Sequence, residues 1–101
     1  MFIAIYRWKI KPGMEKQFQE SWHTRTETIY RECGSLGSRL HLMEDGTWLA
    51  YAQWPGKEKW ESVPKNEDDA RRKMTECIAT DYPALFMTVV DDLLQSSRFG
   101  R

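Results

Sequence analysis

The sequence has no excess of charge of either sign. Lysine and arginine together number 15, and so do aspartate and glutamate, which gives a formal net charge of zero. Nucleic-acid-binding proteins usually carry a basic surplus, because much of their affinity comes from contacts with phosphates. We therefore expect no nucleic acid among the partners of this protein.

The sequence also lacks a long apolar run. No stretch approaches the ~20 consecutive apolar residues that a membrane-spanning helix needs. The apolar N-terminal stretch is interrupted by Arg7 and Lys9 and has no small-residue cleavage site, so it does not have the pattern of a signal peptide. These absences predict a cytoplasmic protein without a membrane partner.

Cysteine and histidine are scarce, with two residues of each. The spacing of Cys33 and Cys77 matches no metal-binding motif, and we expect both to be small buried thiols. No serine, cysteine or carboxylate forms a recognisable nucleophile constellation with a histidine. The sequence thus predicts neither a metal nor another cofactor.

Aromatic side chains, by contrast, are abundant. They make up 13% of the chain, and five of them are tryptophans. In so small a protein this abundance suggests an aromatic-lined cavity or an interface. The length of 101 residues fits one domain. We expect that domain to span residues 1–94 and a mobile C-terminal tail to span residues 95–101.

The stretch 35–54 has the pattern of a β-hairpin, with Asp45-Gly46 as a two-residue turn between two alternating runs. Such a turn would pair Leu42 with Leu49, and partners across the strands share a face of the sheet. One face is then core-like. It carries Leu40, Leu42, Leu49 and Tyr51.

The opposite face of this hairpin mixes polar, aromatic and small side chains. It carries Gly37, Arg39, His41, Met43, Trp48, Ala50, Ala52 and Trp54. The alanines leave room, so this face predicts a recess lined by His41, Arg39 and Trp54. A register shift of one residue would exchange the two sets of side chains and remove this recess.

The order of the expected elements predicts the fold. We expect a strand over 2–10, a helix over 14–33, the hairpin, one or two helical turns over 57–63, a helix from Asn66 to about Ala79, and a last strand over 84–91. This β-α-β-β-α-β order is typical of an α+β, ferredoxin-like fold, with a four-stranded antiparallel sheet and both helices on one face. The other face, which by the predicted register carries Trp48, Trp54 and the alanines, is left uncovered. A second copy of the chain, related by a two-fold axis, would cover it in a homodimer.

Several of these residues resemble a known family. Tyr51-Ala52-Gln53-Trp54, followed six residues later by Trp60, is similar to the dimeric α+β barrel proteins of the antibiotic-biosynthesis monooxygenase superfamily. The stretches Lys11-Pro12-Gly13 and Leu40-His41, the latter shortly before Asp45-Gly46, fit the same pattern. The resemblance extends from Phe2 to about Asp91 and implies a dimeric barrel.

The resemblance also implies residue roles. In the actinorhodin-type monooxygenases of this superfamily, a pocket tryptophan and a strand histidine correspond to Trp54 and His41. The family's pocket tyrosine corresponds to Trp60, and its key asparagine corresponds to Ala50, which has no polar group. In the haem-degrading branch of the superfamily, an asparagine of the first strand corresponds to Tyr6. The other residues typical of that branch are also absent at the corresponding positions, so haem degradation is set aside.

Each candidate residue has a functional and a structural interpretation. His41 could accept a proton as the catalytic base, or could lie at a dimer contact. Arg39 could bind an anionic or phenolate substrate, or could form an intersubunit salt bridge. Trp54 and Trp60 could stack on a planar ring, or could pack at the sheet edge. Tyr6 could donate its hydroxyl into the cavity if its side of the strand faces away from the helices.

Two functions are compatible with these residues. One is a cofactor-independent monooxygenase that acts on a small aromatic or quinol-type substrate, with His41 as the base and Tyr6, Arg39, Trp54 and Trp60 binding the substrate. The other is a non-catalytic dimeric module that binds a small molecule or serves in assembly. The alanine at position 50 favours the second.

Overall fold

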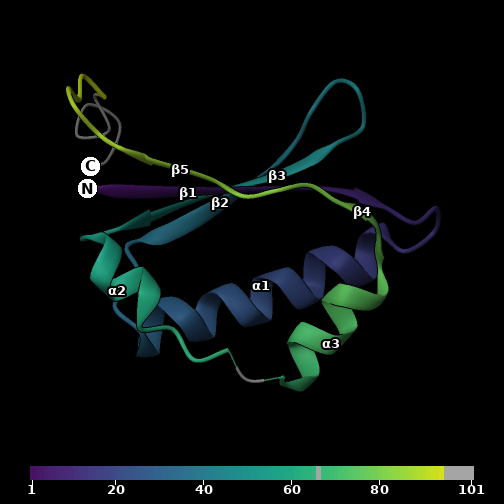
Figure 1. The fold of residues 1–101 in the computed structure, drawn as a ribbon. Helices are drawn as coiled ribbons and strands as arrows, with labels where there is room; N and C mark the ends of the chain where they lie inside the picture. Colours follow the sequence, from purple (N-terminus) through teal and green to yellow (C-terminus); the bar gives the residue numbers. More distant parts are fainter. Residues whose placement is uncertain (66, 95–101) are drawn as a thin grey trace, which may run out of the picture.

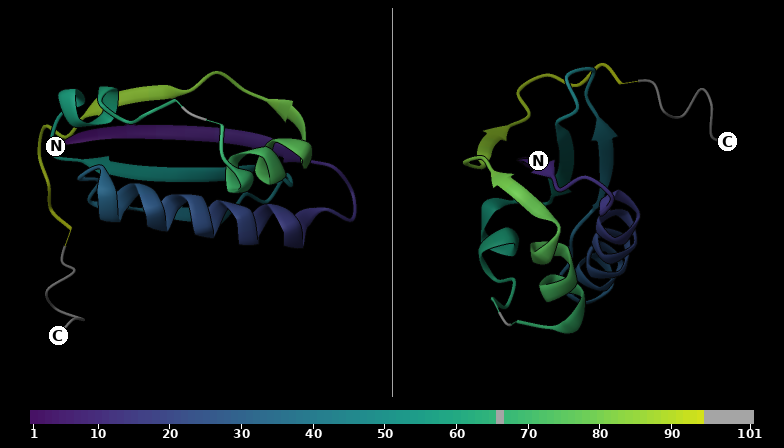
Figure 2. Two further views of the ribbon diagram at one scale, coloured as in Figure 1. Left: turned by 90° about the horizontal axis from the view of Figure 1, so that it is seen from below. Right: turned by 90° about the vertical axis from the view of Figure 1, so that its right-hand side faces the viewer.

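A computed structural model describes residues 1–65 and 67–94 and shows an antiparallel sheet with helices on one side (Figures 1 and 2). The elements along the chain are β1 (Phe2–Ile10), α1 (Glu15–Glu32), β2 (Gly37–Leu42), β3 (Trp48–Trp54), α2 (Lys57–Glu61), α3 (Asp69–Glu76), β4 (Ile78–Asp81) and β5 (Leu85–Thr88). The strand order is β2-β3-β1-β4, and β5 also pairs with β1. The predicted α+β, ferredoxin-like fold is confirmed. The tail expected over residues 95–101 lies outside the described residues.

The last part of the sheet differs from the prediction of one strand over 84–91. Two short strands share the same edge of β1: β4 pairs with Trp8–Ile10 and β5 with Phe2–Ile5. Between them lies Pro83, which has no N–H to donate to a ladder. The N–H of Tyr82 donates instead to the carbonyl of Arg7, at 3.1 Å. The sheet edge is therefore interrupted next to the middle of β1.

Helix α3 is also shorter than expected. Its N-cap is Asp68, whose carboxylate accepts a hydrogen bond of 2.7 Å from the backbone N–H of Arg71. The expected cap, Asn66, lies outside the described residues. The helix ends at Glu76 rather than near Ala79, because Ile78 already pairs with β1. No described helix is long and apolar enough to cross a membrane.

The predicted register of the hairpin is wrong by one residue. Leu42 pairs with Trp48, and His41 pairs with Leu49. The N–H of Gly46 donates to the carbonyl of Met43, and the N–H of Met43 donates to the carbonyl of Thr47. The connection is therefore a three-residue loop that closes on Gly46 with φ at +87°, which is a common alternative to the two-residue turn.

This shift moves the aromatic residues of β3 to the other face of the sheet. Trp48, Ala50, Ala52 and Trp54 face the helices, where Phe18 of α1 meets Trp48 edge-on with ring centroids 5.7 Å apart. Arg39 and His41 share their face with Tyr51 and Leu49, on the side without helices. The predicted recess lined jointly by His41, Arg39 and Trp54 is therefore wrong.

The buried core has two parts. One contains Phe2, Ala4, Ala52 and Trp54, and the other contains Trp8, Phe18, Ala50 and Cys77. Phe18 anchors α1 in the second part, with its ring 5.1 Å from that of Trp8. Cys77 is buried as expected, Cys33 is half-buried, and both are free thiols. Side chains of both parts border a cavity under the helices.

Candidate ligand-binding site

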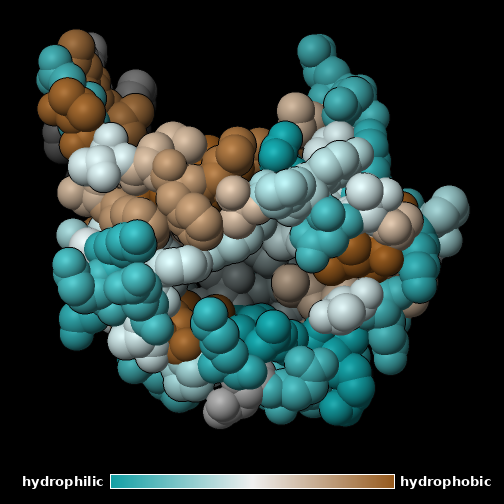
Figure 3. All heavy atoms as spheres, viewed as in Figure 1, coloured by the Kyte–Doolittle hydropathy of each residue, from teal (hydrophilic) through white to brown (hydrophobic). Residues whose placement is uncertain are grey.

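A cavity of about 710 Å³ lies between the helix-covered face of the sheet and the helices. Its lining comes from β1–β4, from all three helices, and from the chain before β2 and between α2 and α3. Figure 3 shows the opening as a hollow between the outer strands and helices α2 and α3. A cavity of this volume is in the range of small-molecule sites.

The cavity exists because β3 carries two alanines, Ala50 and Ala52, between two tryptophans on its inner face. Ala50 lies opposite Tyr6, and Ala52 lies opposite Ala4, so the middle of the sheet carries little bulk. Large rings stand around this low area. They belong to Tyr6, Trp8, Trp22, Trp54 and Trp60. The result is a floor of alanines with aromatic walls, a shape suited to a flat ring system.

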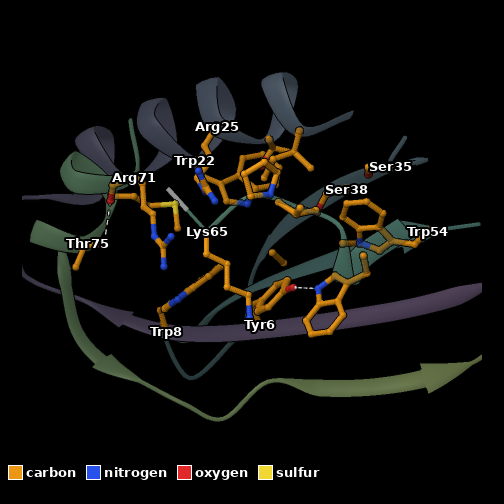
Figure 4. Close-up of a pocket in the computed structure, with 18 of the residues that line it drawn as sticks. Tyr6, Trp8, Trp22, Arg25, Ser35, Ser38, Trp54, Lys65, Arg71 and Thr75 are labelled. Carbon is orange, nitrogen blue, oxygen red and sulfur yellow. Dashed lines mark hydrogen bonds between the residues drawn. The ribbon is translucent and has the colours of Figure 1, made fainter. Parts of the chain in front are cut away.

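Tyr6 and Trp60 form a hydrogen-bonded pair in the wall. The indole Nε1 of Trp60 donates to the hydroxyl of Tyr6 at 2.8 Å (Figure 4). Burial raises the pKa of Tyr6. The hydrogen bond from Trp60 and the charge of Arg25 lower this pKa, but their effect is smaller than that of burial. Tyr6 is therefore a neutral phenol near neutral pH. Its hydroxyl accepts from Trp60 and keeps its own proton for a further acceptor.

Trp54 contributes a second polar group. Its side chain is 4% exposed, and its Nε1 has no hydrogen-bond partner among the described residues. A buried N–H without a partner costs about 1–3 kcal/mol. Trp54 lines the cavity (Figure 4), but its Nε1 is inaccessible to water, so an acceptor atom bound there would reach the N–H and remove this cost only after a small displacement of the side chain. Tyr6 therefore offers one donor to an oxygen atom of a ligand, and Trp54 would offer a second after that displacement.

Cationic side chains lie on the opposite side of the cavity. Arg25 comes from α1, Arg71 from α3, and Lys65 from the chain between α2 and α3 (Figure 4). Arg25 contacts Asp68 at 3.4 Å, and Arg71 contacts Glu67 at 3.5 Å. The site therefore combines neutral donors on the sheet with positive charge on the helices.

The structure brings together three of the five site residues expected from the sequence. Tyr6, Trp54 and Trp60 line the cavity. Tyr6 does so although its side of β1 faces the helices, because the cavity itself lies on that side. Arg39 and His41 do not line it: they are exposed on the other face, and Nδ1 of His41 lies 3.2 Å from the carbonyl oxygen of Leu49.

Sequence reasoning missed the residues that α1 and α3 contribute. Trp22, Arg25 and Ile29 are spaced by three and four positions on α1 and all line the cavity. An arginine inside an otherwise apolar stripe at helical spacing was the available signal. Over residues 1–65 and 67–94, no three His, Cys, Asp or Glu side chains are grouped as metal ligands.

The fold and the cavity place the protein in a defined class, the ferredoxin-like α+β proteins with a small-molecule-sized cavity between sheet and helices. Residues 1–68 match the sequence model of the antibiotic biosynthesis monooxygenase family, and the chain belongs to that family. The family resemblance seen in the sequence is thereby confirmed. A comparison with curated proteins found no match.

Solved structures share the fold at low sequence identity. An antibiotic biosynthesis monooxygenase is similar with a TM-score of 0.71 and 16% identity over 90% of this chain and 100% of its own. The Rv0793 protein of Mycobacterium tuberculosis gives a TM-score of 0.74 and 11% identity, over 92% of this chain and 98% of its own. A candidate antibiotic biosynthesis monooxygenase from Bordetella bronchiseptica gives a TM-score of 0.74 and 18% identity, over 88% of this chain and 96% of its own.

Proposed function

We propose that this protein binds a small aromatic or quinol-type compound in the cavity under its helices and oxidises it as a cofactor-independent monooxygenase. The observation that carries the proposal is the unpartnered indole N–H of Trp54 in an aromatic-walled cavity. An oxygen substituent on a flat ring would accept from Trp54, and from Tyr6, while the ring lies over the alanines. Membership of the monooxygenase family supports the same reaction class.

The chemistry requires a substrate that can itself reduce molecular oxygen. When a ring methylene group is oxidised to a carbonyl, the substrate supplies all the electrons that the oxygen molecule takes up. One oxygen atom then enters the product, and the other leaves as water with the two hydrogens of the methylene group. The protein would hold the ionised substrate oxygen with Tyr6 and Trp54 and keep bulk water from the intermediate.

The proton that the substrate loses needs an acceptor. His41, the base expected from the sequence, is exposed on the face without helices. The carboxylates that line the cavity are those of Glu61 and Asp81, both exposed. A substrate that is already ionised at neutral pH would need no base at all. This placement, and Ala50 in place of the family's asparagine, favour the alternative function of a non-catalytic small-molecule-binding module.

Oxygen uptake separates the two functions. With an electron-rich quinol or anthrone as substrate, the monooxygenase function predicts oxygen consumption above the rate without protein, and loss of that excess in Trp54→Phe. Binding of the same compound without excess oxygen uptake would instead support the binding module. Failure of both binding and uptake across such compounds would contradict the proposed function.

We further propose that the protein is a homodimer that pairs through the helix-free face of the sheet. Leu85 and Met87 of β5 are 44% and 43% exposed, and they lie beside Ile5 and Ile3 on that face. Beyond β5 the chain continues on the side of the sheet away from the helices (Figure 1), with Val90, Leu93 and Leu94 highly exposed. A second copy would cover these side chains.

The remaining expectations from the sequence stay predictions. They are a cytoplasmic location, the absence of nucleic-acid and membrane partners, the absence of a metal or other cofactor, and a single domain over residues 1–94. The described residues show no grouping of metal ligands. Elemental analysis and an absorption spectrum of the purified protein would test the cofactor prediction directly.

A further inference from the structure

We infer that the ligand of this cavity is an aromatic acid, whose ionised acid group binds Arg25. The inference rests on the proposed function for the aromatic part of the ligand and adds the charge. It would extend the site from the sheet, where Tyr6 and Trp54 lie, to the helices on the opposite side (Figure 4).

Arg25 is placed like a ligand-binding group rather than a surface cation. It projects from the middle of α1 into the cavity, and its side chain is 18% exposed. A guanidinium has five N–H donors. Among the described residues, the side chain of Arg25 forms one hydrogen bond, from Nη1 to Asp68 at the long distance of 3.4 Å. Most of its donors are therefore available to a carboxylate, which a guanidinium can bind through two parallel hydrogen bonds.

The partner of Arg25 is a weak competitor. The side chain of Asp68 is 50% exposed, and its carboxylate also caps α3 through the backbone N–H of Arg71. An ion pair with such an exposed partner contributes little, because water screens the charges. A ligand acid group inside the cavity would meet Arg25 in a drier environment, where the same attraction is stronger.

The other charges around the cavity fit this arrangement. Lys65 lines the cavity from an exposed position and forms no ion pair with any described residue. Arg71 also lines it, half-buried and contacting Glu67. The acidic residues of the lining, Glu61 and Asp81, are exposed. The more buried charged groups of the lining are thus cations, which favours an anion inside the cavity.

The experiment compares two ligands of the same shape, naphthoate and naphthamide, by isothermal titration calorimetry on the full chain. We expect naphthoate to bind at least about tenfold more tightly than naphthamide, because hydrogen bonds to a charged group are strong enough to give this difference in affinity. Arg25→Gln should remove this preference, weakening naphthoate about tenfold and leaving naphthamide unchanged. Arg31→Gln, on the exposed part of the same helix, is the matched control and should change neither affinity.

Asp68→Asn gives a test in the opposite direction. Asparagine is as good an N-cap as aspartate, so α3 should be retained. Removing the competing charge should strengthen naphthoate binding a few-fold and leave naphthamide unchanged. If Arg25→Gln does not fold, the salt dependence of the wild-type protein replaces it, and naphthoate affinity should fall with added salt while naphthamide affinity stays constant.

The outcomes separate this inference from the proposed function. Equal affinities for the two ligands would overturn the inference and leave aromatic binding in place. A naphthoate preference that survives Arg25→Gln, or that does not respond to salt, would also overturn it. Failure of both ligands to bind would overturn the proposed aromatic site and this inference with it.

Discussion

Trp60 of α2 donates a hydrogen bond of 2.8 Å from its indole Nε1 to the hydroxyl of Tyr6, 54 residues away on the central strand β1. This contact fixes one wall of the cavity, because it joins the short helix α2 to the sheet. Trp60 also packs on Phe2 and Phe86, with ring centroids 5.8 and 4.7 Å away. The pair therefore stabilises the fold and shapes the site at the same time.

Removing the hydroxyl of Tyr6 tests this double role. Tyr6→Phe keeps the ring but leaves the N–H of Trp60 without its acceptor, which should lower the free energy of unfolding by about 1–2 kcal/mol. Chemical denaturation measures the change. Tyr30→Phe, at an exposed position of α1, is the matched control and should be close to neutral. Equal stability of Tyr6→Phe and the wild-type protein would show that the hydrogen bond contributes nothing.

The raised pKa of Tyr6 predicts a loss of stability at alkaline pH. Burial favours the neutral phenol in the folded state, so above the ordinary value of 10.0 the unfolded chain loses this proton first. The free energy of unfolding should then fall as the pH rises through that value toward the higher folded pKa. Denaturation of the wild-type protein and of Tyr6→Phe at several pH values isolates this contribution, and parallel curves for the two proteins would contradict it.

Filling the floor of the cavity should abolish ligand binding. Ala52→Leu places a branched side chain between Trp54 and Ala50, at a cost of about 1–3 kcal/mol in stability. Calorimetry should show no binding of naphthamide, while sedimentation shows an unchanged assembly, because the helix-free face is not altered. Ala79→Leu, at an exposed position of β4, should bind like the wild-type protein. Unchanged binding in Ala52→Leu would place the ligand elsewhere.

The proposed homodimer predicts that negative charge on the helix-free face of the sheet separates the two subunits. The wild-type protein should sediment as a dimer at micromolar concentration, with an interface of more than ~1,000 Å². Leu85→Glu combined with Met87→Glu should give a folded monomer, because buried unpaired carboxylates are costly. A stable wild-type monomer would contradict the dimer.

His41→Ala tests the base role that the sequence suggested. General base catalysis contributes about 100-fold or more in rate. His41 is exposed and lies outside the cavity, so we expect it to contribute far less to the rate. Oxygen uptake by His41→Ala should therefore stay close to that of the wild-type protein. A loss of about 100-fold in oxygen uptake, with binding unchanged, would restore His41 as the base.

The fold could be predicted from the sequence because it follows from the order and type of the elements. The hairpin register could not, because Asp45-Gly46 is compatible with both a two-residue and a three-residue loop, and the difference exchanges the faces of the sheet. Trp60 was identified through the family pattern, which does not depend on the register. Trp54 was predicted both from that pattern and from the incorrect register, and it lines the cavity on the face opposite to the one expected. Arg25 was missed although it falls between Trp22 and Ile29 on the apolar stripe of α1, because the spacing alone does not show that this stripe borders a cavity.

The proposed function depends most on one hydrogen bond, which the indole N–H of Trp54 would donate to an oxygen atom of an aromatic ligand bound in the cavity. The most direct measurement follows the indole N–H signals of the five tryptophans by NMR while naphthol is added, with Trp54→Phe to assign the signal. We expect a saturable downfield shift of the Trp54 signal that is larger than that of Trp48. Saturable naphthol binding that leaves the Trp54 signal in place, or no binding at all, would contradict it.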